Sequence, residues 1–465
     1  MRQWGESALK SRCGRHILCT RFLEIIIRPL MQATLWLAVY LSLVMVPLVL
    51  AHWPPQAGAA GFGWDFAMAL GYAGVAMMGV QFVLTARFKR ACAPFGIDVI
   101  YFFHRYLALV MLVLIALHAL IATGLDPGAV GLLDPRHAVP AISIGRLALL
   151  LIAVLLISSL WRKRIGIDYD RWRRVHAVLA ILALLLAVGH VDMAARMLNS
   201  PGKRLAWTLL SLAWLGLIVH VRLIRPWRLR RRPFRVRAVQ AEHGRSVSLQ
   251  LEPVGHAGFD YQPGQFAWLS VGDSPFALRE HPFSLASSPT RPGSITFTIK
   301  ALGDFSTAIA GCKPGTVAYV DGPYGAFSCD RYPKAAGFVF IAGGVGIAPI
   351  ISMLRALADR NDSRPLWLFY GNRLWQHTLF RKELQTLGER LNLHLVHILG
   401  EPDANWRGER GLLRLEILLR HLPDQRADLH YFFCGPQPMI GVAERALKAL
   451  AVPLRHMHSE IFDLA

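Results

Sequence analysis

The chain has 465 residues, of which 54% are hydrophobic, and it carries a formal net charge of +21 at pH 7. The cations gather beside long apolar segments, where they contact lipid headgroups and set membrane orientation, so we expect no nucleic-acid partner. The six cysteines form no CxxC pair and no clustered iron–sulfur spacing, which excludes an appended ferredoxin domain.

The first part of the chain is predicted to cross a lipid bilayer six times. A span of about 20 apolar residues is enough to cross the hydrocarbon core. Six spans put both termini on one side, and the loops on that side are the more basic ones. The positive-inside rule therefore predicts a multi-pass protein of the cell membrane with both termini in the cytoplasm, and residues 1–29 are expected to be a basic cytoplasmic segment rather than a secretory signal. The predicted spans are 31–52, 63–86, 101–124, 144–161, 174–195 and 203–224.

Two of these spans carry histidine pairs at the same spacing. His104 and His118 are fourteen residues apart, and so are His176 and His190. Fourteen positions come within about 40° of a whole number of helical turns, so each pair lies on one helix face, about 21 Å apart along the axis. If the two helices run in the same direction, His104 faces His176 and His118 faces His190. Because imidazole is an axial haem ligand, this pattern predicts two haems across the membrane. The alternative is that the histidines make polar contacts between helices.

Beyond a basic linker at 225–234 the sequence pattern becomes that of a soluble domain. Short alternating segments separated by Gly and Pro are typical of a small antiparallel β-barrel. From Gly337 onward, strands alternate with helices, which predicts an α/β domain with a parallel sheet. The expected parts are a basic N-terminal segment, 1–29, a six-helix membrane domain, 30–225, a β-barrel domain, 226–334, and an α/β domain, 335–465.

Three short motifs lie in the barrel part. The first, Arg279-Glu280-His281-Pro282-Phe283-Ser284, offers a hydroxyl and backbone groups to a planar ring and a cation to a phosphate. The second, KALGDFST, reads as a turn into a helix start that could cradle a pyrophosphate, although ordinary turn chemistry explains it equally well. Its notable residues are Lys300, Gly303, Ser306 and Thr307. The third is a tight turn with two aromatic rings, containing Gly322, Pro323, Tyr324, Gly325 and Phe327.

Two further motifs lie in the α/β part, each between a strand and a helix. In AGGVGIAPI, glycines would let the backbone approach a dinucleotide diphosphate. Its residues of interest are Gly343, Gly344, Gly346 and Pro349. The other motif is Cys434-Gly435-Pro436, which would put a small polarizable sulfur near a nicotinamide. The alternative for Cys434 is a buried structural cysteine.

The order and spacing of these five motifs resemble the ferredoxin–NADP reductase superfamily across 226–465. Joined to six spans with paired histidines, nearly the whole chain resembles the ferric reductase and NADPH oxidase family of transmembrane haem flavoproteins. The resemblance implies a β-barrel that binds FAD, an α/β domain that binds NAD(P)H, and two haems b in the membrane, held by His104 with His176 and by His118 with His190.

The resemblance also implies roles for individual residues. The isoalloxazine ring is expected against His281, Pro282, Phe283 and Ser284, and the FAD phosphates near Arg279, Lys300, Ser306 and Thr307. The pyridine nucleotide is expected at Gly343, Gly344 and Gly346, with Cys434 at its nicotinamide. Glu460 and Phe462 match an acid–aromatic pattern beside the flavin, so the expected catalytic residues are Cys434, Glu460 and Phe462. The other expected cofactor-binding residues are Gly303, Gly322, Tyr324, Gly325, Pro349, Gly435 and Pro436.

The expected function is electron transfer from cytoplasmic NAD(P)H through FAD and two haems to a small extracytoplasmic acceptor, a ferric chelate or oxygen. An extracytoplasmic redox partner protein is the alternative acceptor, and a haem-free flavoreductase whose histidines merely pack is a third possibility. Arg373 follows the strand after the glycine-rich helix, where a cation could pair with a 2′-phosphate, and no acidic residue lies in that turn. NADPH is therefore favoured, with NADH still possible.

Overall fold

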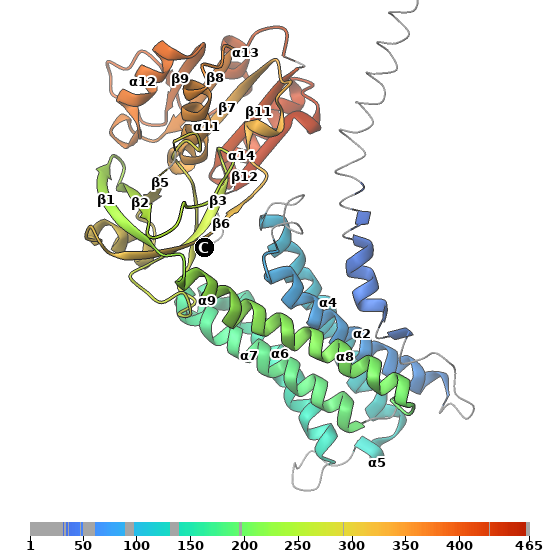
Figure 1. The fold of residues 1–465 in the computed structure, drawn as a ribbon. Helices are drawn as coiled ribbons and strands as arrows, with labels where there is room; N and C mark the ends of the chain where they lie inside the picture. Colours follow the sequence, from blue (N-terminus) through green and yellow to red (C-terminus); the bar gives the residue numbers. More distant parts are fainter. Residues whose placement is uncertain are drawn as a thin grey trace, which may run out of the picture. The chain divides into compact units, whose positions relative to one another are not determined.

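The computed structural model describes residues 31–461, except positions 32–33, 36, 47, 50–60, 89–96, 131–138, 195–197, 292 and 427. The chain divides into two compact units, Met1–Val221 and Arg222–Ala465. The first unit is helical, and the second contains two β-sheets (Figure 1). Each unit is considered by itself.

Five helices in the described part of the chain are long and apolar enough to span a membrane. Of the expected first span, 31–52, the structure describes 31, 34–35, 37–46 and 48–49, and a shorter apolar helix, Leu37–Val46, falls within it. The last long helix, α8, passes through a π-helical turn, η1, into α9. The helices are α2 (Phe62–Thr85), α4 (Ile97–Leu125), α5 (Pro127–Val130), α6 (Pro140–Ile165), α7 (Tyr169–Ala194), α8 (Pro201–Val219), η1 (His220–Ile224) and α9 (Arg225–Arg230).

Local sequence signals begin and end these helices. Pro140 occupies the first turn of α6, where the backbone N–H that proline lacks is not needed, and Gly166 ends α6 with a left-handed φ of 73°. The Ser200 hydroxyl accepts the backbone N–H of Lys203 at 3.2 Å and so caps α8. The last turn of α6 is basic, as expected for a helix that ends at a lipid headgroup layer.

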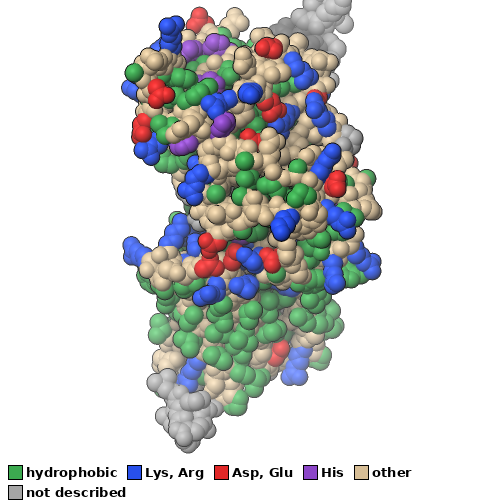
Figure 2. All heavy atoms as spheres, turned by 90° about the vertical axis from the view of Figure 1, so that its left-hand side faces the viewer, with side chains coloured by type: hydrophobic (Ala, Val, Ile, Leu, Met, Phe, Trp, Pro, Cys, Tyr) green, Lys and Arg blue, Asp and Glu red, His purple; other side chains and the backbone are tan. Residues whose placement is uncertain are grey.

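The long helices differ in how much of their apolar surface is covered. In α2, 61% of the apolar stretch is buried inside the protein, compared with 11–22% in the other four. Helix α2 therefore lies at the centre of the unit, while the others turn apolar side chains outward. Figure 2 shows these hydrophobic side chains covering one face of the helical unit. An outward apolar surface of this kind is what a lipid environment requires.

The second unit begins with a six-stranded antiparallel sheet. Its strand order is β4-β3-β6-β1-β2-β5, and the residues that follow β4 meet β5 at a bridge between Leu285 and Phe297. This sheet occupies the place of the expected barrel, and its core contains Val236, Leu249 and Phe297. Its elements are β1 (Phe234–Glu242), β2 (Ser246–Pro253), β3 (Phe266–Val271), β4 (His281–Ser284), β5 (Ile295–Lys300), α10 (Asp304–Ala308), η2 (Ile309–Gly311), β6 (Val317–Tyr324) and η3 (Cys329–Arg331).

A parallel sheet follows, with strand order β10-β9-β8-β7-β11-β12. Alternate residues of β7 pack on opposite faces: Phe338 and Phe340 contact the side of α11 and α12, and Val339 and Ile341 the side of α13 and α14. Because helices cover both faces of the parallel sheet, β7 is apolar throughout. The elements are β7 (Gly337–Gly343), η4 (Gly344–Gly346), α11 (Ile347–Asp359), β8 (Leu366–Asn372), η5 (Trp375–His377), α12 (Arg381–Arg390), β9 (Leu393–Leu399), β10 (Glu409–Arg410), α13 (Leu415–His421), β11 (Leu429–Gly435), α14 (Gln437–Ala449), η6 (Leu454–His456) and β12 (Met457–Ile461).

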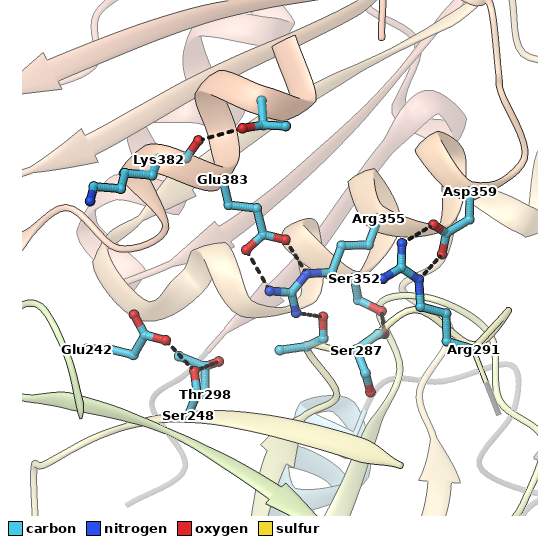
Figure 3. A network of polar contacts seen from close by, with 12 residues as sticks. Glu242, Ser248, Ser287, Arg291, Thr298, Ser352, Arg355, Asp359, Lys382 and Glu383 are labelled. Atoms are coloured by element: carbon cyan, nitrogen blue, oxygen red, sulfur yellow. Dashed lines mark hydrogen bonds and ion pairs between the residues drawn. The ribbon is translucent and has the colours of Figure 1, made fainter. Parts of the chain in front are cut away.

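Polar contacts join helix α11 to the loop after β4 (Figure 3). Arg355 donates to the Ala286 carbonyl at 2.7 Å and pairs with Glu383 of α12 at 2.6 Å. Arg291, in the loop, pairs with Asp359 at the end of α11 at 2.6 Å. Partial burial alone raises the pKa of Asp359, but hydrogen bonds from Arg291 and its neighbours outweigh it and lower the pKa to about 2. The two sheets of the second unit are thus held together by charged contacts that persist at neutral pH.

Candidate cofactor sites

The four membrane histidines form two facing pairs between α4 and α7. The ring centres of His104 and His176 are 6.4 Å apart, and those of His118 and His190 are 6.3 Å apart. The N-terminal histidine of each helix faces the N-terminal histidine of the other. The two helices therefore run in the same direction, as the sequence pattern requires.

Both ring separations fit two imidazoles on opposite sides of one metal ion. An imidazole nitrogen binds a metal at about 2 Å and lies about 1.2 Å from its own ring centre, so two opposed ligands put ring centres about 6.4 Å apart. Among the described residues, no group of three or more His, Cys, Asp or Glu side chains is arranged to bind a metal ion. Each pair offers two imidazole ligands, the number that a porphyrin-held iron can take from a protein.

Cavities accompany both histidine pairs. The first, of about 510 Å³, is lined by His104 and His176 together with four cations, Arg105, Arg162, Lys163 and Arg164. The second, of about 150 Å³, is lined by His118 and His190 with Arg146. Cations at the edge of an apolar cavity fit a planar apolar group that carries carboxylates.

In the second unit, two of the barrel motifs come together through Phe305. Its ring stacks on His281 at 4.1 Å between ring centres and on Phe283 at 6.1 Å. Ser284 is 3% exposed, and its Oγ has no hydrogen-bond partner among the described residues. A buried hydroxyl without a partner fits a polar atom of a ligand. Phe305 was missed in the sequence analysis, although an aromatic residue inside the GDFST motif was the signal that could have revealed it.

The residues expected at the FAD phosphates make different kinds of contact in the structure. Arg279 is partly exposed and pairs with Asp273 at 3.1 Å. The Ser306 hydroxyl accepts the backbone N–H groups of Leu302 and Gly303 at 3.0 and 2.9 Å, so it closes the turn before α10. Thr307 also bonds back through its N–H to the Gly303 carbonyl. Ser306 thus has the turn-forming role that the sequence analysis left open.

The α/β motifs converge on one cavity of about 760 Å³. The cavity lies at the carboxyl ends of β7 and β11, where the chain leaves the sheet in opposite directions, which is the usual ligand site of such sheets. Backbone packing there is close: a Cβ on Gly346 would lie 2.2 Å from the Cys434 carbonyl oxygen. Lys300, expected at the FAD phosphates, is among the residues that line this cavity. The expected residues that line it are Lys300, Gly343, Gly344, Arg373, Gly435 and Pro436.

Cys434 and Glu460 lie side by side on β11 and β12. The Cys434 side chain is fully buried, and burial raises the pKa of its thiol well above the ordinary value, so the thiol is neutral. Its neighbours Gly435 and Pro436, rather than Cys434, line the cavity. Glu460 is in register with Cys434 and also approaches the third barrel motif, because a Cβ on Gly325 would lie 3.7 Å from Glu460 Oε1. Phe462 lies outside the described residues.

Arg373 does not stand alone at the edge of the cavity. Its Nε donates to Glu401 Oε1 at 2.8 Å, and both residues line the cavity. The sequence analysis missed Glu401 because this carboxylate follows β9, a different strand from the one that precedes Arg373. The pair offers both a cation and an anion to whatever binds at this edge.

Three family models match separate parts of the chain. The "Ferric reductase like transmembrane component" model matches residues 70–187, the "FAD-binding domain" model matches 233–328, and the "Oxidoreductase NAD-binding domain" model matches 340–445. The first covers both histidine pairs except His190, and the other two cover the antiparallel sheet and most of the parallel sheet.

Similar proteins match the C-terminal half. "Propane 2-monooxygenase, reductase component" from Mycolicibacterium smegmatis is 31% identical over 47% of this chain and 64% of its own length. "Ferredoxin--NADP reductase B" from Sorangium cellulosum is 30% identical over 46% of this chain and 91% of its own length. The FAD/NAD-binding domain of a Vibrio cholerae nitric oxide dioxygenase is 25% identical, with a TM-score of 0.44 over 50% of this chain and 98% of that one. The chain spans less than two thirds of the monooxygenase reductase components that it matches.

Proposed function

The chain belongs to the ferric reductase and NADPH oxidase family, with a C-terminal half of the ferredoxin–NADP reductase type, and from this we propose that it moves electrons across the cell membrane. The proposed donor is cytoplasmic NAD(P)H, the proposed carriers are FAD and two haems b, and the proposed acceptor is a ferric chelate or oxygen on the opposite side. Both termini are proposed to be cytoplasmic.

The observation that carries this proposal is the equal spacing of the two histidine pairs. The ring-centre distances of 6.4 and 6.3 Å each match two imidazoles that bind one metal ion from opposite sides. Histidines that merely packed between helices would have no reason to repeat one metal-binding distance at two membrane depths.

The chain's own residues would hold each group as follows. FAD exchanges electrons in pairs or singly and haem exchanges them singly, which is the chemistry these groups supply when bound. His281, Phe283 and Ser284 would contact the flavin, with Arg279 near its phosphates. Gly343 and Gly435 would let a nicotinamide nucleotide approach the backbone, and Lys300, which lines the same cavity, would face its phosphates. The four histidines would be the axial ligands.

A protein acceptor is the second candidate. Relatives of the C-terminal half are named as reductase components of monooxygenases, that is, as one component of a larger enzyme. Here the electrons would instead reach an extracytoplasmic redox partner through the membrane unit.

Anaerobic visible spectroscopy of the detergent-purified chain with FAD tests the proposal. We expect two low-spin haems per chain, reduced by NADPH and reoxidised when a ferric chelate or oxygen is admitted. A well-folded protein without a Soret band would contradict the haem assignment and favour the haem-free flavoreductase. Haems that reduce but reoxidise slowly with every small acceptor would favour the partner protein.

The Arg373–Glu401 pair leads to a prediction about nucleotide preference. Glu401 neutralises the cation proposed to meet a 2′-phosphate, and its carboxylate could accept hydrogen bonds from a free ribose hydroxyl. Replacing Glu401 with glutamine should raise the ratio of kcat/KM for NADPH to that for NADH, roughly threefold to tenfold because the pair is exposed. Arg373→Gln should lower the ratio.

Steady-state reduction of ferricyanide with each nucleotide measures this preference. Arg420→Gln is the matched control for Arg373→Gln, because Arg420 is also an exposed cation in an ion pair, with the more buried Glu409 at 2.9 Å, and neither residue lines the cavity. An unchanged ratio in both Glu401→Gln and Arg373→Gln would exclude this pair from nucleotide recognition.

A further inference from the structure

Helix α11 begins at the glycine turn of the proposed nucleotide cavity. It follows directly after η4, and Gly344 of that turn lines the cavity. The body of the helix is packed into the core of the parallel sheet, where Ile350, Ile351 and Leu354 are fully buried. A helix packed this closely behaves as one rigid piece. Any group that contacts the flank of α11 is therefore held at a fixed distance from the glycine turn.

Two side chains on that flank donate hydrogen bonds to consecutive backbone carbonyls (Figure 3). Ser352 Oγ donates to the Ser287 carbonyl at 2.6 Å, and Arg355 Nη1 donates to the Ala286 carbonyl at 2.7 Å. The two donors are three residues apart, so they are neighbours on one face of the helix. Both carbonyls belong to the segment just after β4, the strand proposed to contact the flavin.

Both sides of this junction are held by further contacts. Glu383 of α12 accepts from Arg355 Nε at 2.6 Å and from Nη2 at 2.7 Å, which leaves Nη1 directed at the carbonyl. On the other side, Ser287 Oγ lies 2.8 Å from the Tyr261 hydroxyl and accepts the Thr296 N–H at 3.0 Å. The donors and the acceptors are thus both in place without any bound ligand.

We propose that Ser352 and Arg355 are positioning residues for hydride transfer, because they set the distance between a nicotinamide at the glycine turn and a flavin at β4. The inference rests on the FAD and NAD(P)H of the proposed function and does not involve its haems. In this step a hydrogen leaves C4 of the nicotinamide with both bonding electrons and bonds to N5 of the flavin. NAD(P)H is thereby oxidised to NAD(P)⁺, and FAD is reduced to FADH⁻. A displacement of about 1 Å between reacting groups can slow such a step about 100-fold.

Anaerobic stopped-flow reduction of FAD in the purified full chain, over a range of NADPH concentrations, tests this inference. In Arg355→Met we expect the limiting rate to fall roughly tenfold to 100-fold. The FAD content and the NADPH concentration that gives half the limiting rate should stay at wild-type values, because neither positioning residue lines the nucleotide cavity. Ser352→Ala removes only one of the two donors and should lower the limiting rate less.

A second readout involves no turnover. Tetrahydro-NADPH has no hydride to give, and the long-wavelength charge-transfer absorbance that it produces with oxidised flavin depends on overlap of the two rings. This absorbance, at saturating analogue, should be weaker in Arg355→Met than in the wild type. If Arg355 only stabilised the fold, its replacement would lower the thermal unfolding temperature and leave the absorbance unchanged, which would overturn the inference.

Arg364→Met is the matched control. The Arg364 side chain is 27% exposed, compared with 24% for Arg355, and it also forms a forked ion pair with a carboxylate. Its partner, Asp362, is only two residues away, so this pair does not join α11 to the segment after β4. Arg364→Met should keep the wild-type limiting rate and charge-transfer absorbance.

Failure of this inference differs from failure of the proposed function. Equal falls in Arg364→Met and Arg355→Met would overturn the inference, as would wild-type limiting rates in folded Arg355→Met and Ser352→Ala. If Arg355→Met fails to fold, Ser352→Ala gives the same test by removing a single hydroxyl. A wild-type chain that binds no FAD, or whose FAD neither nucleotide reduces, would overturn the proposed function and the inference with it.

Discussion

Replacing His118 with leucine is expected to halve the haem content, from two per chain to one, and to lower electron delivery across the membrane at least about 100-fold. His118 and His190 face one another at 6.3 Å, so removal of one ring would leave the proposed haem with a single protein ligand. The C-terminal half of the chain does not contain this histidine, so NADPH should still reduce FAD at the wild-type rate. Haem quantification and stopped-flow absorbance of the flavin measure both effects.

His220→Leu is the matched control for this prediction. His220 lies at the start of the π-helical turn η1, with its ring 6.1 Å from that of Phe88, and it faces no histidine. This variant should keep both haems. Full haem content in His118→Leu would mean that the facing histidines pack against each other and do not bind a metal.

Replacing Gly346 with alanine is expected to slow reduction of FAD by NADPH at least about 100-fold while FAD stays bound. The added Cβ would lie 2.2 Å from the Cys434 carbonyl oxygen and 2.9 Å from the Gly435 nitrogen. Both are backbone atoms of β11, so relief requires the end of this strand to move, at a cost of about 1–3 kcal/mol in stability. The strand end that would move lines the cavity proposed for the nucleotide, and the three atoms nearest to the added Cβ all belong to β11.

FAD content, thermal unfolding and stopped-flow reduction by NADPH should be measured together. Gly388→Ala is the matched control: no atom lies within 4 Å of its added Cβ, and its position in α12 favours alanine. Reduction of FAD at the wild-type rate in a folded Gly346→Ala protein would show that the nucleotide does not depend on the end of β11.

The elements and motifs could be predicted because each depends on neighbours in the chain. Apolar length predicted the membrane helices from 63 onward, the fourteen-residue spacing predicted that each histidine pair shares a helix face, and the change to alternating strands predicted two kinds of sheet. Glycines between a strand and a helix predicted a nucleotide site, and the structure has a cavity at the ends of β7 and β11.

The assignments that needed three dimensions were of a different kind. Lys300 was expected at a flavin phosphate and lines the nucleotide cavity, because β5 ends beside the parallel sheet. Ser306 closes its own turn, Cys434 is covered by the core next to α11, and Glu401 meets Arg373 from another strand. The turn of Ser306 is local, but the other contacts join residues that are far apart along the chain, and their closeness in space could not be read from the sequence.

The sequence by itself therefore determined the membrane and soluble halves, the helix face of each histidine pair and the strand-end glycines, since helical and strand periodicity act over a few residues. The facing of His104 with His176 and of His118 with His190 was predicted from the spacing, whereas only the tertiary structure decided the distances between these rings and the contacts of His118 and His190 with the Ala67 and Ala141 carbonyls. The physical reason is that a ring's orientation and hydrogen bonds depend on close packing against another helix, and packing partners are chosen by shape across the whole bundle.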